Sequence, residues 1–406
     1  MRSSGPWAKS TPVPFIPRVP SLARPFVSTP ASVTPSSPGT PPPAAPEGEG
    51  TGGFNIDHLF LGLLAVFFPL AVASHFFFPG TWTFVLCAIA LVPLARLMGE
   101  ATEVIAHKLG SGLGGLMNAS FGNAAELIIA LAALRSGHGD VVKASITGAI
   151  LGNLLLVLGA AILVGGLKYP RQTFNMTAAL SGSAIMFLAL TAMTIPDLFH
   201  AVRGPAAEPV LFPMSVAISV ILLIVYALSL LFSLKTHAHL YAGEEHGTPE
   251  EMPTWSTKKA SVVLLAATVG VVVVAEFLVH AIEPAIATFG FTHTFVGVII
   301  IAIIGNAAEH STAILMALKN KMDLAFNIAF ESSKQIALFV APVLVLVSIP
   351  LGQHLTLEFS HMEVAGIAIG TGAAALIALD GESNWLEGVM LLGVYAILGV
   401  AFFFIP

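Results

Sequence analysis

Apolar segments about as long as a bilayer is thick recur through most of the chain, and they constrain its fold more than any other feature. From Asp57 onward they alternate with short polar breaks. A membrane-spanning helix needs roughly 20 apolar residues, and helices that cross a bilayer satisfy their own backbone hydrogen bonds. Only 10% of the residues are charged, against roughly a quarter in soluble domains. We therefore predict an all-α polytopic membrane protein in contact with a lipid bilayer.

The apolar segments predict about eleven transmembrane helices. They cover residues 57–78, 82–108, 112–134, 141–167, 174–195, 211–234, 259–287, 293–319, 322–349, 360–380 and 385–404. Most lysines and arginines fall in the N-terminal tail and on the breaks that share its side of the membrane. The positive-inside rule therefore predicts a cytoplasmic N-terminus. The predicted location is a plasma or inner membrane, or the membrane of a vacuole-like organelle.

Two polar regions lie outside the predicted helices. Residues 1–53 hold nearly half of the 27 prolines and no apolar periodicity, which predicts a disordered Pro-rich tail. An organellar transit peptide is the alternative, because four basic residues precede the first acid, Glu47. Residues 235–258 hold four glutamates and three histidines. This acidic, His-containing cytosolic loop is either a solvated linker or a weak cation sensor.

An internal repeat divides the apolar part. Gly-Asn-Ala-Ala-Glu stands at 122–126 and again at 305–309, 183 residues later. The two copies lie in the third and eighth predicted helices, and an odd number of intervening crossings reverses the direction of the chain. We therefore predict one extra helix (54–80) followed by two inverted five-helix repeats (81–234 and 259–406). In such folds the equivalent helices meet near the bilayer midplane around a pseudo-two-fold axis.

The repeated motifs place two carboxylates, Glu126 and Glu309, inside apolar segments. An ionised carboxylate in hydrocarbon costs at least ~2.5 kcal/mol, so such a residue is a functional candidate. If both face one site, their repulsion raises the proton affinity of at least one, and a divalent cation relieves the same repulsion. Protons and Ca²⁺ therefore compete for one pair of groups. This competition is the chemical basis of an antiport cycle.

Asparagines and glycines beside the glutamates are suited to a Ca²⁺ site. Asn123 and Asn306 stand three residues before their glutamates, which puts amide and carboxylate on the same helical face. Ca²⁺ takes roughly six to eight oxygen ligands, which carboxylates, amides, backbone carbonyls and water supply. The glycine at the start of each motif permits close backbone approach or a bend. Cys87 is the single cysteine, so any metal must be held by oxygen, with histidine nitrogen as an addition.

The paired motifs, the span that contains Asn153 and the run Ser332-Ser333-Lys334-Gln335 resemble the cation/proton exchangers of the CAX family, in the Ca²⁺/cation antiporter superfamily. The resemblance covers about residues 57–404. It implies eleven spans, a proton-coupled Ca²⁺/H⁺ antiporter, and alternating access. It also implies that Glu126 and Glu309 bind Ca²⁺ or protons in turn, surrounded by the amide side chains. These amides are Asn123, Asn306, Asn153 and Gln335.

Weaker candidates surround this constellation. Glu103 and Glu276, on the segments before the motifs, either line a cation or proton pathway or brace helices, and Ser332 and Ser333 are further pathway candidates. Where the family usually has a small residue, this chain has Glu331, three positions before Lys334. The pair either neutralises itself or changes cation selectivity. Arg96 is predicted to pair with Glu100, four residues on.

Other functions fit the sequence less well. An exchanger of Na⁺ or K⁺ for H⁺ with the same fold is the runner-up. An intramembrane metallohydrolase would need a compact pair of metal-binding histidines, which is not found, and the repeat alone would also permit a channel. No phosphate-binding loop supports a primary pump, and the small net charge of −6 indicates no nucleic-acid partner. We expect no enzyme activity and no cofactor, with Ca²⁺ and H⁺ as the transported ions; a homo-oligomer is left open.

Overall fold

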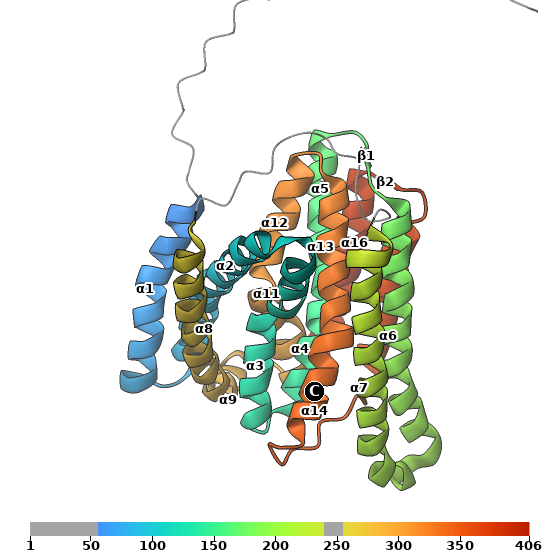
Figure 1. The fold of residues 1–406 in the computed structure, drawn as a ribbon. Helices are drawn as coiled ribbons and strands as arrows, with labels where there is room; N and C mark the ends of the chain where they lie inside the picture. Colours follow the sequence, from blue (N-terminus) through green and yellow to red (C-terminus); the bar gives the residue numbers. More distant parts are fainter. Residues whose placement is uncertain (1–55, 239–254, 406) are drawn as a thin grey trace, which may run out of the picture. The chain divides into compact units, whose positions relative to one another are not determined.

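The computed structural model describes residues 56–238 and 255–405, and nearly all of them are helical (Figure 1). Within these residues seven helical stretches are long and apolar enough to cross a membrane, and residues 282–305 form an eighth if a bent pair of helices counts as one. The predicted all-α membrane fold is therefore confirmed. The number eleven and the domain boundaries stay predictions. The tail (1–53) and most of the acidic loop (235–258) lie outside the described residues.

The helices fall into two series on either side of the acidic loop. The first series is α1 (Ile56–Phe77), α2 (Thr81–Phe121), α3 (Ala124–Arg135), α4 (Gly139–Leu151), η1 (Gly152–Val157), α5 (Leu158–Lys168), α6 (Met176–Arg203), η2 (Gly204–Ala207), α7 (Glu208–Leu231) and η3 (Phe232–Thr236). The second series is α8 (Thr257–His280), α9 (Ile282–Phe289), α10 (His293–Phe295), η5 (Val296–Ile301), α11 (Ala302–Gly305), α12 (Ala307–Leu318), α13 (Met322–Gln335), η6 (Ile336–Val340), α14 (Ala341–Ser348), α15 (His361–Ile377) and α16 (Trp385–Phe404). The short strands β1 (Gln172–Thr173) and β2 (Glu382–Ser383) pair antiparallel.

Corresponding elements recur at the spacing of the sequence repeat. Helices α3 and α12 both contain 12 residues and begin 183 positions apart. The continuous helix α4–η1–α5 corresponds to α13–η6–α14, and both include a π-helical turn, which often marks a functional site. The sequence repeat is therefore also a structural repeat.

The two motif helices run in opposite directions. Helix α3 ends beside the start of the helix 139–168, because only a short turn through His138 separates them. Helix α12 ends at Leu318, whose carbonyl accepts hydrogen bonds from Lys168 and Tyr169 at the far end of that helix (2.9 and 3.2 Å). A helix of 30 residues is about 45 Å long, so the ends of α3 and α12 lie at opposite ends of the bundle (Figure 1). The repeats are inverted, as predicted.

One glycine bends the chain before each motif, and both of these glycines have a positive φ angle. In α2, Gly110 has φ 79° and ψ 174°, so the predicted spans 82–108 and 112–134 are joined by a sharp bend rather than by a loop. In the second series, Gly290 has φ 69° and ends α9, after which the chain turns by 114° into the segment 293–305. Only glycine adopts these conformations without strain.

Polar caps begin several of the long helices. Asn175 and Ser256 accept hydrogen bonds from the third residues of α6 and α8. Both α15 and α16 begin with a capping box, the former made by Ser360 and Glu363. These side chains satisfy amide groups that a helix cannot pair internally. Polar residues at the ends of the apolar segments therefore determine where helices start.

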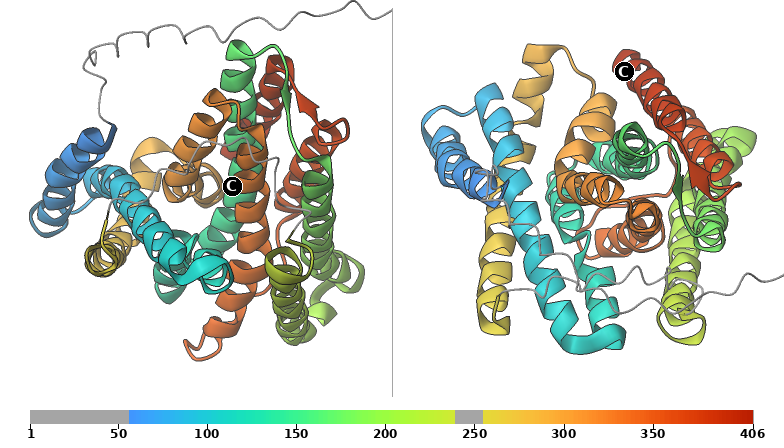
Figure 2. Two further views of the ribbon diagram at one scale, coloured as in Figure 1. Left: turned by 45° about the horizontal axis from the view of Figure 1, so that its top comes forward. Right: turned by 90° about the horizontal axis from the view of Figure 1, so that it is seen from above.

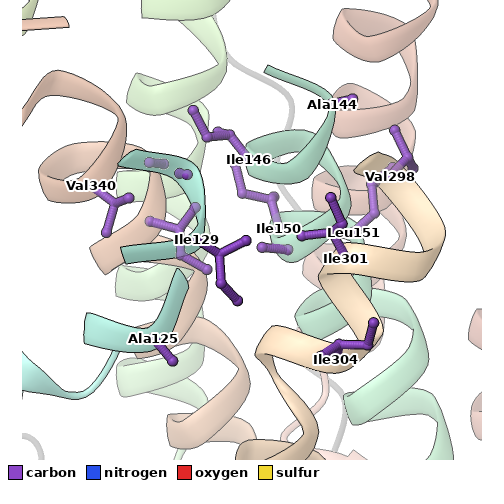
Figure 3. Packing of buried hydrophobic residues seen from close by; sticks show 14 of the residues in the cluster. Ala125, Ile129, Ala144, Ile146, Ile150, Leu151, Val298, Ile301, Ile304 and Val340 are labelled. Atoms are coloured by element: carbon purple, nitrogen blue, oxygen red, sulfur yellow. The ribbon is translucent and has the colours of Figure 1, made fainter. Parts of the chain in front are cut away.

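The helices close to the motifs pack through glycines. A Cβ atom at Gly148 of α4 would lie 2.1 Å from the Val298 carbonyl oxygen of η5, and one at Gly297 would lie 2.4 Å from Ala144 Cβ. Small residues permit this close approach of helices in membranes. Buried aliphatic side chains of α3, α4 and η5 fill the space around this crossing (Figure 3). Figure 2 shows α1, α2 and α8 along one side of this centre and α6, α7 and α16 along the other.

Candidate cation and proton site

Both motif glutamates stand in the first turn of a helix that begins at a break. The chain leaves helical conformation at Asn123 (φ −107°, ψ 31°) and Asn306 (φ −90°, ψ 14°), and the glutamates follow three residues later. The helix is therefore interrupted at both motifs, directly after the glycine that permits a bend. Amide groups in the first turn of a helix lack an intrahelical partner, so each carboxylate lies at a positive helix terminus.

The two motifs meet at the centre of the molecule. A Cβ atom placed at Gly305 would lie 3.2 Å from Glu126 Cγ and 3.3 Å from Glu126 Oε1. The backbone of the second motif thus passes directly against the carboxylate of the first. Glu126 and Glu309 lie near enough for their charges to interact. The structure therefore brings together the two carboxylates that the sequence repeat singled out.

Amide side chains connect each motif to the opposite half. Asn123 donates a hydrogen bond from Nδ2 to Gln335 Oε1 of the second half (2.6 Å). Asn153 of the first half donates from Nδ2 to Asn306 Oδ1 (3.1 Å). Neither motif asparagine caps its own helix with its side chain. Their side chains are instead used to join the two repeats around the glutamates.

A serine adds a third polar contact to the first motif. Ser332 donates its hydroxyl hydrogen to Asn123 Oδ1 (3.0 Å). Ser333, the other serine candidate, instead bonds the backbone carbonyl of Ala329 within its own helix (2.8 Å). The carbonyl oxygens of both motif asparagines thus already accept a hydrogen bond from protein. They are less available as cation ligands than the sequence suggested.

Four buried side-chain oxygens beside these amides accept no hydrogen bond from any described residue. They are both carboxylate oxygens of Glu126, Oε2 of Glu309 and Oδ1 of Asn153. A buried acceptor without a partner costs about 1–3 kcal/mol, and more if it is charged. A bound proton or cation removes this cost. The arrangement is chemically suited to Ca²⁺, which prefers carboxylate and carbonyl oxygens.

A small cavity of about 20 Å³ adjoins Glu126. Its other walls are mainly aliphatic, with Ile129 and Ala130 from α3 and Ile301 from η5. Both this volume and the following one count the space open to the centre of a water molecule. One water molecule needs about 10–15 Å³ of such space, so the cavity holds about one water molecule. The carboxylate therefore lies between an apolar wall and a space just large enough for a water or a dehydrated ion.

The other candidates lie on α2 and α8. Glu103 is exposed on α2. Glu276 of α8 lines a cleft of about 480 Å³ together with Arg135 and Glu283. Arg96 pairs with Glu100 at 2.7 Å, as predicted. The structure therefore groups Glu276 with other charged residues at one end of the bundle and keeps it apart from the central amides.

Glu331 and Lys334 form an ion pair on α13, in line with the self-neutralising alternative. The Lys334 side chain is only 2% exposed, whereas that of Glu331 is 35% exposed. Lys334 directly precedes Gln335, one of the bridging amides. A buried positive charge therefore lies one residue from the site and is balanced by its own helix.

Comparisons with known proteins agree with this arrangement. The family described as "Sodium/calcium exchanger protein" matches residues 79–235 and 259–404. A Ca²⁺/H⁺ antiporter from Synechocystis sp. is 46% identical over 366 residues, covering 86% of this chain and 98% of that protein. The Ca²⁺/H⁺ antiporter ChaA of Bacillus subtilis is 43% identical over 352 residues, covering 86% of this chain and 99% of that protein.

A solved structure has the same fold. Native YfkE superposes with a TM-score of 0.75 at 40% sequence identity, covering 85% of this chain and 100% of that one. The family match and the related antiporters identify the chain as a transporter, not an enzyme. The chain belongs to the sodium/calcium exchanger protein family, within its cation/proton exchanger (CAX) branch.

Proposed function

We propose that the protein exchanges Ca²⁺ for H⁺ across a membrane, with Glu126 and Glu309 binding Ca²⁺ and protons in turn. The observation that carries this proposal is the group of buried, unpartnered oxygens contributed by both inverted repeats. Related proteins are named Ca²⁺/H⁺ antiporters, which supports Ca²⁺ and H⁺ as the two exchanged ions. Na⁺/H⁺ or K⁺/H⁺ exchange is the alternative.

Competition between the two ions follows from charge. Two ionised carboxylates in an apolar centre repel each other, and either a divalent cation or added protons offsets that repulsion. Ca²⁺ would bind when Glu126 and Glu309 are both ionised, with Asn153 Oδ1, backbone carbonyls and water completing its ligands. Protons would bind once Ca²⁺ has left. The carrier then carries no unbalanced charge through the apolar region in either direction.

Alternating access would use the bends that precede the motifs. The bend at Gly110 joins the motif segment to the first part of α2, and the bend at Gly290 joins the equivalent segment to α9. Since the repeats are inverted, a movement that opens one bend toward one side corresponds to an opening of the other toward the opposite side. We propose a cytoplasmic N-terminus, in accordance with the distribution of lysine and arginine.

The test is ion exchange in proteoliposomes. A pH gradient should drive Ca²⁺ movement, and Glu126→Gln or Glu309→Gln should each lower the initial rate by at least about 100-fold, because glutamine cannot change charge. Glu208→Gln is the matched control, since Glu208 is also in the first turn of an apolar helix but is exposed. Its rate should equal that of the parent protein.

Each alternative has its own outcome. Exchange that is driven by Na⁺ or K⁺ and not by Ca²⁺ would replace the cation assignment. Exchange at a comparable rate in either motif variant would refute the two-carboxylate mechanism and direct attention to Glu103, Glu276 or Glu331. Gel filtration in detergent must show that each variant is folded before its rate is interpreted.

A further inference from the structure

Three metal-ligating side chains from both repeats converge at one end of the bundle. His293 Nε2 lies 2.8 Å from Glu283 Oε1, and His138 Nδ1 lies 3.9 Å from the same oxygen. One ligand atom from each residue lies within 4.8 Å of the other two. Among the described residues this is the one group of three or more histidine, cysteine or acidic side chains with that spacing.

The group joins segments that are far apart in the sequence. His138 lies in the turn between α3, which carries Glu126, and α4. Glu283 lies in α9, and His293 lies just after the bend at Gly290. The cluster therefore spans the end of a motif helix of one repeat and the bend that precedes the motif of the other.

The ligand set determines which metal it suits. Two imidazoles and one carboxylate are the protein ligands of many open Zn²⁺ sites, where water takes the fourth position. Ligands about 2.0–2.2 Å from Zn²⁺ lie about 3.3 Å apart in a tetrahedron. His138 and Glu283 need to approach by less than about 1 Å from their present 3.9 Å. Ca²⁺ prefers an all-oxygen shell, so this group is not a second copy of the central site.

The surroundings favour a cation that arrives from solvent. The side chains of His138, Glu283 and His293 are 22%, 58% and 44% exposed, so they can reorient at little cost. His138 and Glu283 also line the 480 Å³ cleft, to which Glu276 adds a second carboxylate and Arg135 one positive charge. With neutral histidines the cleft has a net negative charge.

We propose that His138, Glu283 and His293 form a binding site for a divalent metal of the zinc class, and that the bound metal slows ion exchange by holding the two repeats together. The metal would fix the bend at Gly290 relative to the end of α3. This proposal is independent of the identity of the transported cation, because the site lies outside the central group of carboxylates and amides.

Zinc binding to the purified full-length protein in detergent tests the site without any transport assay. Calorimetry should give one Zn²⁺ per chain, and His138→Gln or His293→Gln should weaken binding at least about tenfold. His200→Gln is the matched control, because His200 also pairs with a glutamate, Glu358, but belongs to no such group of three within residues 56–238 and 255–405. Equal affinity in His138→Gln and the parent protein would overturn the proposal.

Two further measurements separate this site from the central one. Glu126→Gln should bind Zn²⁺ as the parent protein does, and excess Ca²⁺ should not displace the metal; loss of Zn²⁺ in either case would place it in the central site and refute the proposal. In proteoliposomes Zn²⁺ should slow exchange by the parent protein several-fold and by His138→Gln much less. Unchanged exchange at saturating Zn²⁺ would refute the bridging effect.

Discussion

Helices α3 and α12 are equal in length and both start within the repeated five-residue motif, yet the segments that carry the bridging amides Asn153 and Gln335 differ in sequence. In α13 the four residues before the bridging amide Gln335 are Glu331, Ser332, Ser333 and Lys334. The four residues before Asn153 are Ala149, Ile150 and Leu151 of α4 and Gly152 of η1. The first motif is therefore held by Gln335 and Ser332 of the other half. The second is held by Asn153 and by a bond from Asn306 to the Ala302 carbonyl of its own segment.

This comparison separates what the symmetry requires from what one repeat has added. The glutamates and bridging amides occur in both halves, so they belong to the shared site. The ion pair and Ser332 occur in one half, so they modify the site without defining it. The three predictions below test that separation, from the largest expected effect to the smallest.

The largest effect on stability should come from removing one partner of the ion pair between Glu331 and Lys334 in α13. Glu331→Gln leaves the positive charge of Lys334, which is 2% exposed, without its partner. Stranding a buried charge in this way costs about 3–5 kcal/mol. Lys334→Met should cost less, because the remaining Glu331 is 35% exposed. Thermal unfolding in detergent should therefore occur at a lower temperature in Glu331→Gln than in Lys334→Met.

Ca²⁺/H⁺ exchange measurements on the same variants show whether the ion pair between Glu331 and Lys334 is required for transport. Folded Glu331→Gln should still exchange Ca²⁺ for H⁺, with altered preference among cations. If the folded variant has no exchange at all, Glu331 is part of the transport site and the halves differ in chemistry as well as in structure.

A smaller effect is expected from a methyl group at the contact between the motifs. In Gly305→Ala the new Cβ would lie 3.3 Å from Glu126 Oε1 and displace the carboxylate. Overpacking costs about 1–3 kcal/mol, so the Ca²⁺ concentration for half-maximal exchange should rise about tenfold. Gly372→Ala is the control, since no atom lies within 4 Å of its added Cβ. Equal values for the two variants would mean that Glu126 does not bind Ca²⁺ in this position.

The smallest effect concerns the two amide bridges. Double-mutant cycles with alanine at Asn123 and Gln335, and at Asn153 and Asn306, should each give a coupling of about 1 kcal/mol in unfolding free energy. The first coupling should be the larger, because that bond is shorter, 2.6 against 3.1 Å. Asn153 with Gln335 is the non-bridging control and should be additive. Absent coupling in both bridges would show that the halves are held together by packing alone.

The sequence predicted the parts of this site that depend on the repeat. Identical residues in oppositely directed apolar segments were enough to single out Glu126 and Glu309 with Asn123 and Asn306. Asn153 and Gln335 came from the resemblance to the cation/proton exchangers. The motif glycines permitted a bend, but the breaks at Asn123 and Asn306 themselves were not predictable, because apolar segments near 20 residues look the same whether the helix is continuous or interrupted. Interrupted backbone is tolerated at membrane depth where protein, rather than lipid, surrounds it.

Contacts between distant segments were also beyond sequence reasoning. The pairing of Asn123 with Gln335, and of Asn153 with Asn306, is a property of how the halves pack. The same limit applies to His138 and His293, which lie far apart in the chain and so lack the compact spacing by which metal-binding histidines are recognised.

The hydrogen bonds between amide side chains of opposite halves have a consequence for the ancestry of the fold. One repeat alone supplies a glutamate and two amides, but the hydrogen-bond partner of each amide lies in an inverted copy. An ancestor of a single repeat would have needed to insert into the membrane in both orientations and to dimerise before it could form such a site. Fusion of the copies makes that pairing permanent, which allows one copy to acquire residues such as Glu331 and Lys334 while the other keeps its apolar helix.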